Sequence, residues 1–251
     1  MNVLAGFFPG ICVLCRRRSR CDVDLCPECE AAFEHNERAC PVCAEPATPG
    51  SASPEICGAC IVSPPPWTIT VAPFIYGAPL SRVVEGLKSG NGLREARILG
   101  GLLGPAIRTR YRRDVLPDAL IAMPLTRRRR RQRGYNQAEL LASVVGRVVD
   151  RPVLKGKLVR TRHSPPQRTL PRSARLRNVR GAFDVRRTVR ERVFARTAET
   201  MPKRVALVDD VTTTGATVRA ASETLRAAGV EEVHVWVAAK TGPVRDGRFV
   251  A

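Results

Sequence analysis

Two adjacent carboxylates followed by a turn rich in hydroxyl groups form the clearest chemical pattern in this sequence. In the segment VALVDDVTTTGAT, residues 205–217, four apolar residues run directly into Asp209 and Asp210, and threonines and Gly215 follow. Carboxylates accept hydrogen bonds from sugar hydroxyls or hold the water shell of a divalent cation. A hydroxyl-rich, glycine-containing turn that leads into a helix offers backbone N–H groups to a phosphate. The pattern therefore predicts a site for a phosphorylated sugar.

Three other interpretations of the acid pair fit the sequence less well. A magnesium site of a P-loop nucleotidase would need the motif GxxxxGK[ST], which does not occur in the sequence. The phospho-acceptor pocket of a receiver domain places its acids on separate strands. A strand end with two solvated aspartates explains the pair, but it does not explain the threonines and the glycine that follow.

The cysteines predict a second kind of chemistry. All nine lie within the first 60 residues, and eight of them form four CxxC pairs separated by 10, 10 and 13 residues. Each CxxC turn aims two thiolates at one ion, so four turns predict two closed structural zinc sites. The predicted ligands are Cys12, Cys15, Cys26, Cys29, Cys40, Cys43, Cys57 and Cys60. We expect the first pair to join the second and the third to join the fourth, in preference to a cross-brace, and Cys21 to be a free thiol. Disulfides would require an oxidising compartment, and a redox CxxC would occur once beside a βαβ unit.

The charge balance favours anionic partners. The chain carries a net charge of +19, from 42 basic and 23 acidic residues. A coding bias can explain why only five of the bases are lysine, but it does not explain the excess of base over acid. No apolar run has the roughly 18 residues of a membrane span, and the first residues lack the basic start and cleavage site of a secretory signal. We therefore expect no membrane insertion and a cytoplasmic location.

The elements that must position these residues follow from apolar periodicity. Strands are predicted at 68–77, 118–123, 205–208 and 233–239, and helices at 80–90, 93–113, 136–149 and 217–229. Asn136, with Glu139 three residues later, is typical of a helix start. Strands that alternate with helices predict an α/β domain with a mainly parallel sheet. We expect a cysteine-rich double zinc ribbon at 1–63, a stiff linker around SPPPW at 63–67, and the α/β domain at 68–251.

The segment 205–217 resembles the phosphoribosyl pyrophosphate (PRPP) signature of type I phosphoribosyltransferases. Together with the cysteine module and RRQRGYNQAELLA at 131–143, it makes nearly the whole chain similar to the ComF family, which is linked to DNA uptake in competent bacteria. The resemblance implies a type I phosphoribosyltransferase-like fold in which Asp209 and Asp210 hold the ribose hydroxyls. It also implies that the 5′-phosphate is wrapped by Thr213, Thr214, Gly215, Ala216 and Thr217.

Two arginine-rich segments complete the site that the resemblance implies. The segment 124–136 corresponds to a loop whose amides bind the diphosphate, with candidates Leu125, Thr126, Arg127, Arg133 and Asn136. The long polar segment 158–183 corresponds to a lid, with matching residues Gln167, Arg172, Arg177 and Asn178. Magnesium is expected between the ribose hydroxyls and the diphosphate. The segment 186–204 is longer than the resemblance leads us to expect.

Two classes of function remain open at this point. In the first, the protein binds PRPP with magnesium and transfers the phosphoribosyl group. In the second, it is a non-catalytic nucleic-acid-binding protein in DNA uptake, with single-stranded DNA or a DNA-uptake helicase as its partner. The basic segments and zinc ribbons fit the second class, but aromatic residues make up only 5% of the chain, which argues against a platform for stacked bases.

Overall fold

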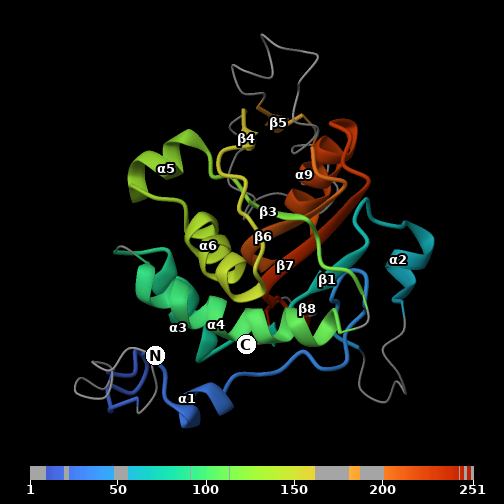
Figure 1. Cartoon of the computed structure of the whole chain (residues 1–251). Coiled ribbons are helices and arrows are strands. Elements are labelled where there is room, and N and C mark those ends of the chain that lie inside the picture. The colour runs from blue at the N-terminus through green and yellow to red at the C-terminus, as the bar shows by residue number, and fades with distance from the viewer. Residues whose placement is uncertain are drawn as a thin grey trace.

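A five-stranded parallel sheet forms the centre of the molecule. The computed structural model describes residues 10–19, 23–47, 56–90, 92–112, 114–161, 181–186 and 201–242, and the backbone of 244–245 and 248–249. The strands lie in the order β1 (Ile69–Val71), β7 (Glu232–Lys240), β6 (Arg204–Thr212) and β3 (Ala119–Ala122), and β2 (Phe74–Ile75) pairs with the end of β7. Every pairing in this sheet is parallel, so all its strands end at the same edge (Figure 1).

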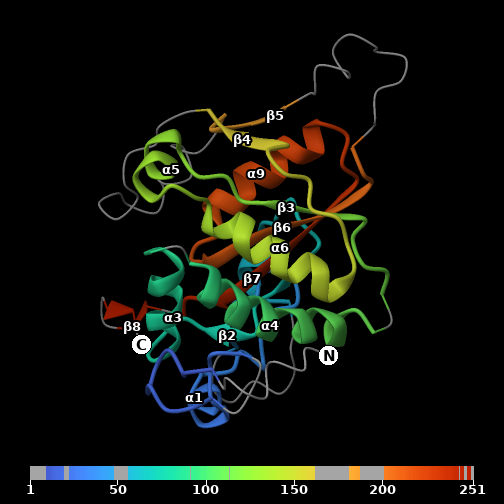
Figure 2. The ribbon, with the colours of Figure 1, turned by 60° about the vertical axis from the view of Figure 1, so that its left-hand side comes forward.

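Helices cover both faces of this sheet, as expected for a parallel sheet with apolar strands. Helices α3 (Leu80–Leu87), α4 (Leu93–Arg110) and α6 (Gln137–Val149) lie on one face, and α9 (Ala216–Ala227) lies on the other (Figures 1 and 2). Strand β7 is buried from its second residue to its last. The predicted α/β class with a mainly parallel sheet is confirmed.

Two small antiparallel ribbons lie outside the main sheet. Strand β4 (Leu158–Arg160) pairs with β5 (Phe183–Val185) above α9, and β8 (Val244–Arg245) pairs with β9 (Arg248–Phe249). The predicted lid falls between β4 and β5, and most of it, at residues 162–180, lies outside the described residues. Most of the segment 186–204 also lies outside them.

The start of α6 agrees with its sequence signal, but one further helix was not predicted. The side chain of Asn136 accepts a hydrogen bond from the backbone N–H of Ala138 at 3.1 Å, and so caps α6 as predicted. The arginine run, which we expected to be a loop, is instead the helix α5 (Arg127–Arg133). Thr126 caps its start and Gly134, with φ of 78°, ends it; arginine is a good helix former between such caps.

The cysteine-rich residues pack against the sheet domain at two separate places. Helix α1 (Pro27–Ala31) of the first ribbon lies below α3 and α4, whereas α2 (Gly58–Val62) of the second lies beside β1 (Figure 1). The first ribbon is joined to α4 by an ion pair between Arg94 Nε and Asp24 Oδ2 at 2.8 Å. Phe33, which lies between the two groups of cysteines in the sequence, packs edge to face on Phe74 of β2, with the ring centroids 5.6 Å apart. Both ribbons thus share the core of the sheet domain.

Among the described residues, the structure contains no helix with the length and apolar character needed to cross a membrane.

Close packing of α4 on α6 depends on two glycines of α4, which gives a direct test of the fold. A Cβ at Gly100 would lie 2.5 Å from Cγ1 of Val144, and a Cβ at Gly104 would collide with Cγ1 of Val148. We expect Gly104→Ala to lower the free energy of unfolding by about 1–3 kcal/mol because the helices must separate. Urea denaturation followed by circular dichroism measures this change.

Gly101, on the same helix, provides the matched control. A Cβ there meets nothing within 4 Å. Gly101→Ala should therefore stabilise the protein by up to about 1 kcal/mol through helix propensity alone. Equal effects of the two substitutions would contradict this packing.

Candidate functional site at the carboxyl edge of the sheet

The acid pair lies near the carboxyl end of β6, where parallel sheets place their ligands. Asp210 is buried, and its Oδ2 forms an ion pair of 2.6 Å with Nζ of Lys88. Asp209 is half-buried, and its Oδ1 accepts a hydrogen bond of 2.9 Å from the backbone N–H of Asp210. Lys88 comes from the end of α3, more than a hundred residues earlier in the chain.

The two carboxyl groups differ in their tendency to ionise. Burial raises the pKa of Asp209 well above its usual range, and the charge of Asp210 raises it further. Burial acts in the same direction on Asp210, but the Lys88 ammonium and a hydrogen bond from Asp209 outweigh it and lower the pKa of Asp210. Close carboxyl groups share protons in this way because two like charges cannot both be stabilised. The pair therefore favours a protonated Asp209 and an ionised Asp210.

The turn after β6 leads directly into α9. The side chains of Thr213 and Thr214 are exposed, Ala216 is buried and Thr217 is half-buried. Gly215 is the N-cap of α9, with φ of 73°, a conformation that other residues rarely adopt. Lys240, at the end of β7, supports the turn, because its Nζ donates a hydrogen bond to the carbonyl of Thr213. This arrangement leaves hydroxyl groups and a helix N-terminus facing outward beside the acid pair.

The segment 124–136 contributes mainly to the support of this edge. Asn136 is buried, and its amide donates to the carbonyl of Met123 at 3.1 Å while it caps α6. Nη1 of Arg133 donates to Oε1 of Gln137 at 2.8 Å, and the Thr126 hydroxyl accepts from the N–H of Arg129. Of the predicted residues here, Arg127 has an exposed side chain, and Leu125 is half-buried.

Four residues that we did not predict belong to the site or its support. Lys88 forms the ion pair with Asp210, and Lys240 donates a hydrogen bond to the carbonyl of Thr213 in the turn. The Tyr135 hydroxyl bonds the carbonyls of Leu87 and Ser89, at 2.8 and 3.0 Å, on either side of Lys88. The fourth is Arg160, the last residue of β4. Two of the four lie in segments that the sequence analysis singled out: Tyr135 in RRQRGYNQAELLA at 131–143, and Arg160 in the predicted lid at 158–183.

Arg160 lies near the start of the segment 158–183, the predicted lid. Its guanidinium lies over the Phe183 ring, 5.5 Å from the ring centroid, and its buried Nε has no hydrogen-bond partner among the described residues. Burial lowers the pKa of Arg160; the charge of Arg129 adds to this effect and the charge of Asp209 opposes it. Arg160 is thus a half-buried cation whose Nε–H is available to an anion. The predicted lid residues Gln167, Arg172, Arg177 and Asn178 lie outside the described residues.

The eight predicted zinc ligands form two clusters. The thiol groups of Cys12, Cys15, Cys26 and Cys29 form one, and those of Cys40, Cys43, Cys57 and Cys60 form the other, each with sulfur atoms within 4.8 Å of one another. The Sγ atoms of Cys15 and Cys26 lie 3.6 Å apart, as do those of Cys43 and Cys57. A tetrahedral ion with Zn–S bonds of about 2.3 Å would set sulfur atoms roughly 3.8 Å apart, so both clusters fit zinc. The serial pairing is confirmed; Cys21 lies outside the described residues.

Each cluster is built from a turn and the start of a short helix. In the first, the N–H of Arg16 bonds the carbonyl of Cys12 at 3.0 Å; in the second, the N–H of Ala44 bonds the carbonyl of Cys40 at 2.8 Å. Burial opposes ionisation of these two cysteines, but backbone N–H groups aimed at their sulfur atoms lower the pKa of Cys12 to about 6 and that of Cys40 to about 7. Their thiolates are thus prepared for a metal.

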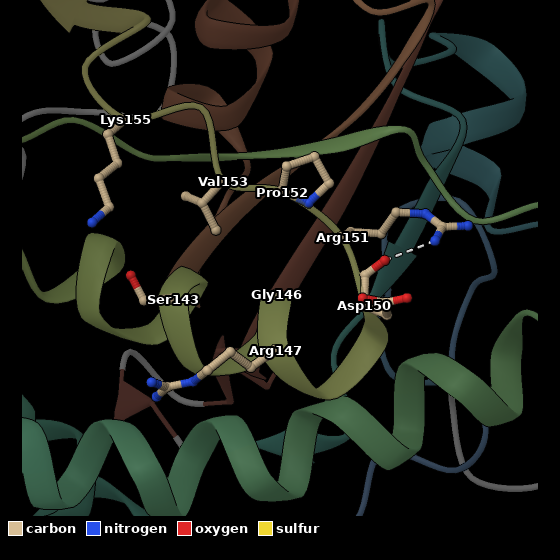
Figure 3. A pocket seen from close by; sticks show the side chains of 8 residues that line it. All are labelled: Ser143, Gly146, Arg147, Asp150, Arg151, Pro152, Val153 and Lys155. Atoms are coloured by element: carbon tan, nitrogen blue, oxygen red, sulfur yellow. Dashed lines mark hydrogen bonds between the residues drawn. The ribbon is translucent and has the colours of Figure 1, made fainter.

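An open hollow beside α6 is separate from this edge. It is lined by Ser143, Gly146, Arg147, Asp150, Arg151, Pro152, Val153 and Lys155 (Figure 3). None of the predicted site residues borders it. At its border, Arg151 Nη1 donates to the carbonyl of Asp150 at 2.8 Å (Figure 3). Arg147 projects from α6 and Lys155 from the segment that follows this helix.

Comparison with known proteins first defines the class. The family model "Double zinc ribbon domain" matches residues 3–61. A structure of glutamine PRPP amidotransferase from B. subtilis aligns with 59% of this chain and 27% of its own, at 22% identity and a TM-score of 0.36. Purine phosphoribosyltransferase from Pyrococcus horikoshii aligns with 72% of this chain and 85% of its own, at 16% identity and a TM-score of 0.30. The protein combines a double zinc ribbon with a parallel α/β domain.

Curated relatives then define the family. "Competence protein F" of Haemophilus influenzae is 34% identical over 93% of this chain and 98% of its own length. "DNA utilization protein YhgH" of Escherichia coli K12 is 32% identical over 92% of this chain and 91% of its own. The chain belongs to this family, the ComF family.

The unequal acid pair predicts opposite effects of two similar substitutions. Asp209→Asn should raise the melting temperature at pH 7.5 by roughly 2–4 °C, the effect of about 1 kcal/mol in a chain of this size, because it removes a carboxyl whose ionisation the fold opposes. Asp210→Asn should lower it, by roughly 4–8 °C for about 2 kcal/mol, because it leaves Lys88 without its buried partner. Scanning calorimetry measures both.

The pH dependence of the melting temperature separates the opposed ionisation of Asp209 from the loss of the ion pair between Asp210 and Lys88. A raised pKa makes ionised Asp209 unfavourable only above the ordinary carboxyl pKa of about 4, so the gain from Asp209→Asn should be absent near pH 4 and grow as the pH rises. The contribution of Asp210, whose pKa is lowered, is present above that value and is lost as the pH falls below it. Gains of equal sign for both variants at pH 7.5 would contradict the assignment.

Proposed function

We propose that this protein binds PRPP with magnesium at the carboxyl edge of its sheet and acts on the phosphoribosyl group. One observation supports this most strongly: an acid pair and a hydroxyl-lined helix start occupy consecutive positions at the end of β6. A phosphorylated ribose carries the two matching groups, hydroxyls and a phosphate, on one small ring.

In this proposal each part of the edge has its own role. Asp209 and Asp210 accept hydrogen bonds from the ribose hydroxyls and offset charge that develops on the sugar ring. The turn from Thr213 to Thr217 binds the 5′-phosphate with its hydroxyl and amide groups. Magnesium, when bound, neutralises the departing diphosphate. The carboxylate oxygens of the acid pair suit such a hard cation.

The diphosphate is assigned to the arginine-rich side of the edge. Leu125, Thr126 and Arg127 lie at the start of α5. Arg160 is assigned to the same group because the charges of Arg129, on α5, and of Asp209 both act on its pKa. Arg133 and Asn136 are engaged with Gln137 and Met123, so we assign them to positioning. The lid residues Gln167, Arg172, Arg177 and Asn178 are proposed to close over the reaction centre and exclude water.

A second function is favoured by the names of the relatives and by α5. The relatives are called competence and DNA utilization proteins, and the arginines from 127 to 131 on α5 have exposed side chains. One small ligand cannot contact all of them. We therefore propose that α5 contacts the phosphates of single-stranded DNA, and we place the protein in the cytoplasm, where thiols stay reduced for zinc.

Calorimetric titration with Mg-PRPP tests the first function. The double variant Asp209→Asn/Asp210→Asn should bind at least about tenfold more weakly, because each lost charged hydrogen bond is worth about 1.5–3 kcal/mol. The double variant is also more positive than the wild type, so simple attraction of an anion would make it bind more tightly.

The matched control is Asp114→Asn/Glu223→Gln, which removes two exposed acidic groups elsewhere. It should bind Mg-PRPP as the wild type does. No measurable heat with wild-type protein, or equal binding by both double variants, would rule out the proposed site.

Salt dependence tests the second function. We expect single-stranded DNA to bind with an affinity that falls steeply with salt, and Arg128→Gln/Arg131→Gln to reduce the slope by about 1.4, or roughly 0.7 per lost phosphate contact. Fluorescence anisotropy of a labelled oligonucleotide between 50 and 200 mM salt measures this. Arg147→Gln/Lys155→Gln, on the hollow beside α6, removes the same charge elsewhere, and an equal change of slope there would contradict a role for α5.

A further inference from the structure

The second zinc cluster lies directly behind the turn that we assign to the phosphate. The carbonyl of Val42, inside the Cys40–Cys43 turn, accepts two hydrogen bonds: one from Nε1 of Trp67 at 2.8 Å and one from the Thr70 hydroxyl at 2.6 Å. Residues that fold around the zinc ligands therefore fix the Trp67 ring.

The opposite side of the Trp67 ring contacts the turn. A Cβ at Gly215 would lie 3.2 Å from Cη2 of Trp67, so the ring occupies the space that a side chain at this position would need. The guanidinium of Arg219, one turn into α9, lies over the same ring at 5.7 Å from its centroid. Trp67 is 9% exposed, which leaves it little freedom to move. Its position thus determines how closely residue 215 can approach the second zinc cluster.

A second, independent contact joins the same two parts. Nζ of Lys240, at the end of β7, forms an ion pair of 2.8 Å with Oε2 of Glu45 and also donates to the carbonyl of Thr213. The backbone of Glu45 belongs to the zinc turn, because its carbonyl accepts from the N–H of Cys40 at 2.9 Å. Lys240 is buried, with 5% of its surface exposed, so its charge depends on these partners.

The first zinc cluster has no such contacts among the described residues. Arg94, at the start of α4, joins it to the sheet domain by donating to Oδ2 of Asp24 and to the carbonyl of Ile11. The two clusters have the same ligands and the same local build, but the second alone is connected to the turn by these two bridges. This difference supplies an internal control.

We propose that Trp67 and Lys240 are positioning residues that couple zinc in the second cluster to the shape of the turn Thr213–Thr217. With the cluster folded around its ion, the Val42 carbonyl and the Glu45 carboxylate hold both residues in place. Loss of that ion frees Val42 and Glu45, and the turn loses its support on two sides. The consequence for PRPP affinity rests on the proposed function; the consequence for the order of the turn does not.

The experiment uses the full chain and two matched cysteine substitutions. Cys43→Ser and Cys15→Ser each remove the second ligand of the first CxxC in a cluster, and both residues are half-buried. Elemental analysis should find two zinc ions per chain in the wild type, as two four-cysteine clusters require, and a loss of one in each variant. Amide hydrogen exchange of peptides covering 211–219 is then measured without ligand. Cys43→Ser should raise exchange there by about tenfold, within the usual range of coupling between sites, and Cys15→Ser should leave it unchanged.

A second pair of variants keeps the zinc and removes the bridges. Trp67→Phe loses the bond to Val42 and the contact of Cη2, and Lys240→Met loses both of its bonds. Each should keep the wild-type zinc content but show faster amide exchange in 211–219. Exchange in the other strands of the sheet should stay as in the wild type. Unchanged exchange in these variants, or equal exchange in Cys43→Ser and Cys15→Ser, would overturn the proposal.

Titration with Mg-PRPP separates this inference from the proposed function. We expect Trp67→Phe and Lys240→Met to bind about tenfold more weakly, which corresponds to about 1.4 kcal/mol. If the wild type binds no PRPP while exchange in 211–219 still follows the second cluster, the coupling stands and the proposed function fails. If the wild type binds and the two variants bind equally well with unchanged exchange, the coupling fails and the proposed function stands.

Discussion

The structure depends on the placement of two carboxyl groups at the end of a buried strand with one ammonium group beside them. Strand β6 is buried up to Val208, and two ionised aspartates immediately after it would repel each other in poorly hydrated surroundings. Lys88 stabilises one negative charge, on Asp210, and the second carboxyl group retains its proton more strongly. Such a pair is costly for folding, but it places a hydrogen-bond donor and an acceptor side by side. Active sites commonly hold groups in this unfavourable state because a ligand relieves it.

The rest of the domain can be understood as support for this arrangement. Tyr135 fixes the carbonyls on either side of Lys88, and Asn136 ties the start of α6 to the end of β3. Lys240 and Trp67 hold the turn after β6 against the second zinc cluster. These contacts join segments far apart in the sequence, so the support of this edge comes from several elements of the domain and from the second ribbon.

The sequence predicted what depends on local pattern. The parallel α/β class, the start of α6 at Asn136 and the grouping of cysteines follow from periodicity, capping and spacing, and each is confirmed. Lys88 and Lys240 were missed because nothing near them in the sequence marks them, and Arg160 was missed although it lies in the segment 158–183 predicted to be the lid. The roles of all three come from partners distant in the sequence. The helix α5 was missed for another reason: a run of arginines looks like a solvated loop, although arginine favours helices and both caps, Thr126 and Gly134, were visible in the sequence.

The motif Arg133-Gly-Tyr-Asn136 shows why a resemblance in sequence must be separated into positioning and binding. The hydrogen bonds of its side chains run within the protein, to Gln137, to the carbonyls around Lys88, and to Met123 and Ala138. Gly134 provides the positive φ that ends α5. A motif that fixes Lys88 influences the ionisation of Asp210 without any contact with a ligand. The motif can therefore act on the acid pair through Lys88, whereas Thr213, Thr214 and Arg127 have exposed side chains that can contact a ligand.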